Sequence, residues 1–284
     1  MLDDDQLAAA VSYVTSHGNE VQRARLNSLL GLFPLARDHP AYDLWLAGQN
    51  ADGGWRAGDM RMLQRQRGDE PSSIMETVHA LRIAVELRLP VYAEVRVGLL
   101  WLGSRQQASG AFADPREVIN ARFDIAPNDQ DSCITAFSTA VALHMLDFWV
   151  AAVPTYDRVR DRAYIWLRRN ALGWAEHYRR TVWLAGACAL RREGTNSGIG
   201  VTAMADLSYR LSIHPERFWS TDLADIAVTL IAAGWPKNES PVNTALRLLE
   251  RRQLPDGSFA SPNAQEDPVD ATLGAIRAFR APVP

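Results

Sequence analysis

The chain has 284 residues, of which 47% are hydrophobic, and a formal net charge of −3. This length can bury a large core, and the slightly acidic balance excludes a basic surface for nucleic acid. Cys133 and Cys188 are its two cysteines, which excludes a disulfide framework and suits a reducing cytoplasm. The acidic start MLDDDQ predicts no signal peptide, and no apolar run is long enough to cross a membrane.

Helical patterns run through the whole sequence, and no segment has the pattern of a strand. Apolar residues recur at helical spacing, and Gly, Pro, Asp and Asn separate the periodic segments. The predicted helices are 5–17, 19–31, 40–48, a helix that begins at Ser72 or Ser73, 91–104, 128–146, 156–170, 176–192, 201–212, 221–233, 241–252 and 267–279.

Three connections, 49–55, 106–112 and 253–259, share one pattern: Gln, three residues, Gly, one residue, then Trp or Phe. The glutamines are 57 and 147 residues apart, and 147 is close to three periods of 49. Such a period with two helices per unit predicts an array of about six helix pairs. We expect these turns to specify the fold, because Gln can satisfy helix-end groups and the aromatic ring can pack on a neighbouring unit. A threonine also recurs before a run of small residues in the helices, at Thr77, Thr135, Thr181 and Thr272.

The turn pattern resembles the QW repeat of squalene–hopene cyclases and other class II terpenoid cyclases, and the repeat of protein prenyltransferase β subunits. That resemblance implies an all-α fold, an (α/α)6 toroid of about six helix-pair repeats. It further implies a single terpenoid cyclase-like domain over residues 1–284.

The stretch 128–146 carries the chemistry that this resemblance implies. Asp129-Gln-Asp131-Ser132-Cys133 is similar to the D-x-D-D-T-A motif of class II cyclases, whose middle Asp protonates an alkene or epoxide, although a serine replaces the third carboxylate. The resemblance implies protonation-initiated cyclisation of an isoprenoid in a central hydrophobic cavity, without a cofactor. Asp131 would be the general acid, and Asp129 and Cys133 would support it.

Two alternatives use the same residues differently. Asp131-Ser-Cys133 also resembles the D-x-C of zinc-dependent prenyltransferases, with His177 as a third ligand, so zinc or magnesium is the alternative cofactor. Arg180 stands where that family keeps its His. The other alternative is a non-catalytic α/α toroid that serves as a binding module. A homodimer or a partner domain would complete a one-domain site, and the expected location is cytoplasmic.

Other polar residues are predicted to be structural. Glu76, Asp222, Asp225 and Asp270 stand near helix starts, where capping explains them. His79 and His144 lie within apolar helices, so we expect them to be hydrogen-bonded core residues.

Overall fold

The computed structural model describes residues 2–32, 35–56, 70–116, 118, 131–149, 153–170, 179–260 and 266–281. Within these ranges every regular element is a helix, and the β-type contacts are isolated bridges. The all-α prediction is therefore confirmed. No helix in the described ranges is long and apolar enough to cross a membrane.

The chain divides into two compact units, and the division falls inside one helix. Unit 1 consists of Met1–Leu35 and Gly186–Pro284, and unit 2 of Ala36–Ala185. The prediction of a single domain over 1–284 stays a prediction. Unit 1 contains α1 (Asp4–His17), α2 (Glu20–Leu29), α10 (Gly198–Ile213), η3 (Pro215–Arg217), α11 (Ser220–Ile231), α12 (Val242–Glu250) and α13 (Pro268–Arg280). Unit 2 contains α3 (Pro40–Leu46), α4 (Ile74–Glu86), α5 (Ala93–Ser104), α7 (Asp131–Phe148), η1 (Pro154–Tyr156) and α8 (Asp157–Asn170), and α9 (Arg179–Glu193) crosses the boundary.

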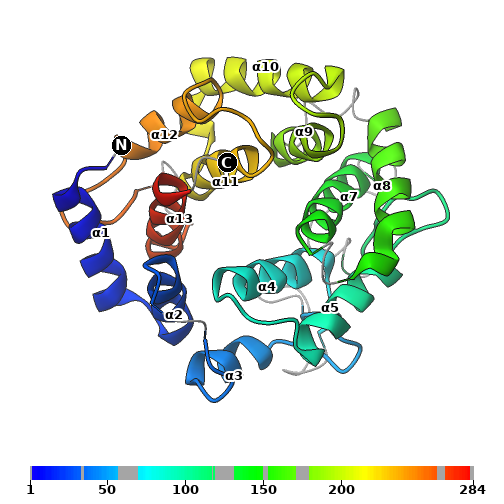
Figure 1. Cartoon of the computed structure of the whole chain (residues 1–284), viewed down its shortest axis with the longest axis horizontal. Coiled ribbons are helices and arrows are strands. Elements are labelled where there is room, and N and C mark those ends of the chain that lie inside the picture. Colours follow the sequence, from blue (N-terminus) through cyan, green and yellow to red (C-terminus); the bar gives the residue numbers. More distant parts are fainter. Residues whose placement is uncertain are drawn as a thin grey trace. The chain divides into compact units, whose positions relative to one another are not determined.

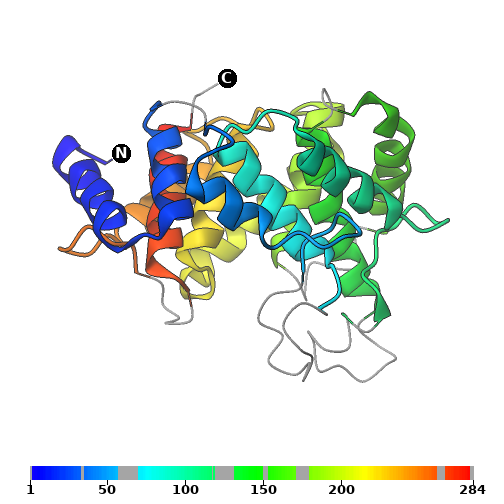
Figure 2. The ribbon, with the colours of Figure 1, turned by 90° about the horizontal axis from the view of Figure 1, so that it is seen from below.

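Unit 1 brings the two ends of the chain together. α11 packs between α12 and α13, and α13 packs against both α1 and α2. Figure 2 shows α2, in blue, running alongside α13, in red. α10, predicted from residue 201, begins already at Gly198, because the Ser197 hydroxyl accepts a hydrogen bond from the Gly200 amide and caps the helix earlier.

Unit 2 is organised around α7, which packs against α4 and α8 (Figure 1). The helix is buried along most of its length, including Phe137, Ala140 and Leu143. A helix that is apolar all round belongs in the interior of a fold. The expected helix 128–146 is thus confirmed from Asp131 onward, and 128–130 lie outside the described residues.

The glutamine of each turn ties one helix pair to the next. Its side-chain amide donates in each case to a backbone carbonyl in the first turn of α5, α8 or α1, none of which directly follows the turn in the chain. The last of these bonds connects the end of the chain to its beginning within unit 1. The donor and acceptor pairs are Gln49 and Glu94 (2.9 Å), Gln106 and Val159 (2.7 Å), and Gln253 and Gln6 (2.7 Å).

The glycine of each turn allows the turn to lie directly against the helix that accepts the glutamine side chain, which is α5, α8 or α1. Gly110 and Gly257 have φ of 98° and 87°, in the left-handed region that favours glycine. A Cβ added at Gly110 would lie 2.6 Å from the Arg162 carbonyl oxygen, and one at Gly257 would lie 2.3 Å from that of Ala9. Only a residue without a side chain fits this approach.

The aromatic residue of each turn is buried and fixes the helix that follows. Trp55, Phe112 and Phe259 are at most 4% exposed. The backbone N–H of each donates to a threonine hydroxyl in the next helix. These contacts support the expectation that the turns specify the fold.

Candidate active site

The predicted general acid, Asp131, is the first described residue of α7. Its backbone is described and its side chain is not, and Asp129 and His177 lie outside the described residues. Cys133 follows in the first turn as a free cysteine that is 7% exposed. The start of α7 therefore joins a carboxylate position to a buried thiol two residues later.

The anchoring threonine of α7 is Thr139, and the expected Thr135 does not fill that position. The Phe112 amide donates to the Thr139 hydroxyl at 2.8 Å, and this hydroxyl donates to the Thr135 carbonyl at 2.6 Å. Thr77 and Thr272 accept the same bond from Trp55 and Phe259. The comparison of the repeats in the sequence placed the threonine of α7 one helical turn too early, because two threonines four residues apart share one face of a helix.

Because Thr139 is the anchoring threonine, α7 has an additional turn before the anchored part of the helix. The anchoring threonine comes three residues after the first residue of α4 and four after that of α13, but eight after Asp131, the first described residue of α7. Asp131 and Cys133 both stand on the additional turn. Anchoring of the helix does not require this turn, so its polar residues are available for another role.

The assignment of Thr139 as the anchoring threonine also removes one argument for the zinc alternative. That alternative paired Asp131 with His177 because each lies four residues before a threonine, Thr135 or Thr181. Thr135 is not the anchoring residue, and the hydroxyl of buried Thr181 has no hydrogen-bond partner among the described residues. The spacing to a threonine therefore no longer makes the positions of Asp131 and His177 equivalent. No group of three His, Cys, Asp or Glu side chains that could hold a metal ion occurs among the described residues, and Asp129 and His177 lie outside them.

Carboxylates from distant segments cap two of the helices, α4 and α11. An Asp114 oxygen accepts the Ile74 amide at the start of α4 at 2.6 Å, and Glu266 accepts the Ser220 and Thr221 amides at the start of α11 at 3.1 and 2.7 Å. The unsatisfied N–H groups and the helix dipole stabilise an anion there.

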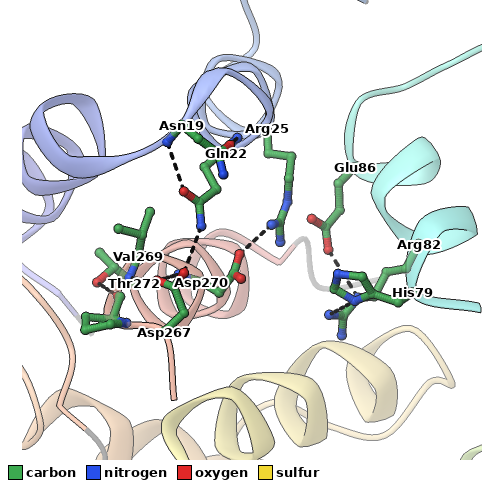
Figure 3. Close-up of polar contacts among 11 residues, drawn as sticks. Asn19, Gln22, Arg25, His79, Arg82, Glu86, Asp267, Val269, Asp270 and Thr272 are labelled. Carbon is green, nitrogen blue, oxygen red and sulfur yellow. Dashed lines mark hydrogen bonds and ion pairs between the residues drawn. The ribbon is translucent and has the colours of Figure 1, made fainter. Parts of the chain in front are cut away.

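Two acids of unit 1 that were expected to be helix caps are ion-paired instead. Arg25, whose side chain is 6% exposed, lies 2.6 Å from Asp270, and Figure 3 shows the two side chains meeting between α2 and α13. Arg277 lies 2.5 Å from Asp225 on α11. Asp222 does act as a cap, accepting the Trp219 amide at 3.1 Å. These pairings join α2, α13 and α11 and could not be read from the sequence, because the partners are up to 245 residues apart.

His79 was expected in the core but is exposed on α4. Its Nδ1 lies 3.2 Å from an Arg82 nitrogen, and Arg82 Nε lies 3.8 Å from buried Glu86 (Figure 3). The pattern of apolar residues around His79 did not reveal that this face of α4 is polar. His144 on α7 is half-buried.

Comparison with solved structures shows what the fold is similar to. A protein from Actinoplanes has a TM-score of 0.62 at 17% identity, covering 98% of each chain. The type II terpene cyclase MstE from Scytonema has a TM-score of 0.58 at 15% identity, covering 97% of this chain and 96% of the cyclase. An Asp-to-Asn variant of that cyclase in complex with geranylgeranyl dihydroxybenzoate, its substrate, matches equally well at 16% identity.

No protein-family model matches the chain, and no curated protein matches it. At identities of 15–17% the structural likeness establishes the fold. The predicted fold class, the all-α toroid of the terpene cyclases, is thereby confirmed.

Proposed function

We propose that this protein is a terpene cyclase-like enzyme that protonates an isoprenoid substrate from Asp131 to start its cyclisation. The observation that carries the proposal is the additional turn at the start of α7, which presents Asp131 and Cys133 beyond the anchored part of the helix. A fold shared with MstE, which was solved with an isoprenoid-bearing substrate, supports the choice of substrate class.

The proposed step transfers a proton from the Asp131 carboxyl group to the substrate. The Asp131 carboxyl O–H gives its proton to a terminal alkene carbon or an epoxide oxygen, leaving a carboxylate and a cation on the substrate. A neighbouring double bond attacks that cation, the ring closes, and loss of a proton from the final cation gives a product of unchanged mass. The carboxylate then regains a proton from water.

The additional turn explains why this position suits an acid. The helix start stabilises the carboxylate that remains after transfer. Asp129 and Cys133 are proposed to hold the acid in place, and Cys133 is suitably buried two residues away. No cofactor takes part in the proposed reaction, and a cytoplasmic location stays a prediction.

Product analysis tests the proposal. The chain is incubated with geranylgeranyl dihydroxybenzoate and with prenyl diphosphates of increasing length, and mass spectrometry searches for isomers of unchanged mass. Asp131→Asn should reduce the rate by at least about 10²-fold, because an amide cannot deliver the proton. Asp129→Asn should reduce it less.

Asp157→Asn is the matched control, since Asp157 is likewise the first residue of a helix, α8, and is 65% exposed. It should leave the rate unchanged. Equal turnover by Asp131→Asn and the parent would disprove the assignment of the acid. Tight binding of these isoprenoids without any conversion would instead favour the non-catalytic binding module.

The zinc-dependent alternative predicts a different measurement. Elemental analysis of the purified chain should find less than one zinc per chain, because Cys133 supplies the single cysteine ligand and Arg180 stands at the expected His position. One zinc per chain that is lost in Cys133→Ser would support the prenyltransferase-like function over the cyclase. Cys188→Ser is the control, since Cys188 is also buried but lies outside the motif.

A further inference from the structure

Two outer helices present very different faces to solvent. Seven residues of α8 are exposed, and six of them are charged, whereas seven residues of α10 are exposed and none is charged. The exposed residues of α10 are Gly198, Val201, Thr202, Ala205, Tyr209, Ser212 and Ile213. Charged residues normally cover the exposed face of a helix in a monomer. The uncharged face of α10 therefore indicates a contact surface.

The apolar members of this face form a regular stripe. Val201, Ala205, Tyr209 and Ile213 follow one another at four-residue intervals, and the three large side chains are 46%, 63% and 45% exposed. Residues at this spacing form a ridge that packs into the equivalent ridges of another helix at about −50°. The sixteen residues of α10 make the face about 24 Å long.

We propose that α10 docks against α10 of a second copy of this chain, antiparallel and about a two-fold axis. The stripe is complementary to itself in this arrangement. With the axis between Ala205 and Tyr209, the large Tyr209 of each copy meets the small Ala205 of the other, and Val201 meets Ile213. Each contact then occurs twice, as a two-fold interface requires.

The charges at the edge of the stripe fit the same arrangement. Asp206 and Arg210 form an ion pair of 2.7 Å on the same helix, one on either side of the proposed axis. Reversal of the second helix brings the negative half of one pair toward the positive half of the other. A parallel arrangement would place like charges side by side, so the charges select the antiparallel one.

The composition of the face favours a protein partner over a membrane. Helices that lie on membranes combine bulky apolar residues with Lys and Arg along the polar face. The exposed positions of α10 outside the stripe instead carry hydroxyl groups or no side chain, and Arg210 is its sole basic residue and is paired with Asp206. Tyr at the centre of a small, uncharged patch is typical of protein interfaces.

Sedimentation velocity over a range of concentrations tests the proposal with the full chain. A single helix pair buries less than a standard interface, so we expect a reversible dimer that forms at roughly micromolar to 100 µM concentrations. Ala205→Glu and Tyr209→Glu each place two like charges at the axis and should weaken the dimer at least about tenfold. Ile165→Glu on α8, where the parent side chain is 47% exposed, is the matched control and should leave it unchanged.

Disulfide cross-linking is a second measurement of the interface, and it does not depend on introduced charges. In a mixture of Ala205→Cys and Tyr209→Cys chains, oxidation should join one variant to the other, and Ile165→Cys should not react in this way. A chain that stays monomeric at about 100 µM, or a dimer that Ala205→Glu leaves intact, would overturn the proposal. A monomer that floats with lipid vesicles would also overturn it and assign the face to a membrane.

Discussion

α13 and α7 are anchored in the same way but differ at their acidic residues. Each begins after a turn segment, and each accepts the backbone N–H of a turn aromatic residue through a threonine hydroxyl. Asp270, in the first turn of α13, forms an ion pair with Arg25 and links two helices. Asp131 stands on a turn that α13 lacks. Packing thus accounts for the acid of one helix, and the acid of the other is the one that we assign to chemistry.

The largest effects should be common to both helices. Phe112→Ala and Phe259→Ala each remove a ring that is at most 1% exposed. Each substitution should cost about 3–5 kcal/mol in the free energy of unfolding, through the lost burial and the cavity together. Urea denaturation measures both, and a cost well below 2 kcal/mol at either site would contradict a shared anchoring role.

The second comparison separates the two acids. Asp270→Asn should lower the free energy of unfolding by about 2–4 kcal/mol, less than for a fully buried pair because Asp270 is 35% exposed. Asp131→Asn should change it by less than about 0.5 kcal/mol, since the additional turn takes no part in anchoring the helix. If Asp131→Asn were the more destabilising change, Asp131 would be a structural residue and the contrast between the helices would fail.

The smallest effects test the register of the anchoring threonines. Thr139→Val and Thr272→Val each leave a buried backbone N–H without an acceptor, which should cost about 1–3 kcal/mol in unfolding free energy. Thr135→Val is the internal control, because its hydroxyl does not accept the Phe112 amide, and it should cost less than Thr139→Val. The reverse order would restore the alignment that the sequence suggested and remove the additional turn of α7.

The turns could be predicted from the sequence because each position answers a local requirement. Position 110 requires glycine because its φ is positive and the Arg162 backbone lies close to it. Position 112 requires an apolar ring because it is buried in the core. The site could be predicted only in part. Helical periodicity does not distinguish Thr135 from Thr139, and the Arg25–Asp270 pair depends on residues that meet only after folding. A carboxylate brought in from beyond the next turn, such as Asp114 at the start of α4, leaves no local pattern either.

The most direct test of the central claim is to run the reaction in D₂O with any isoprenoid that the protein cyclises. Exchange loads the Asp131 carboxyl group with deuterium, and protonation of a carbon then fixes that deuterium in the product. We predict a product about one mass unit heavier than its substrate, with the deuterium at the carbon that starts the ring, and no such product from Asp131→Asn. A cyclised product formed from an alkene without deuterium would contradict initiation by an exchangeable acid.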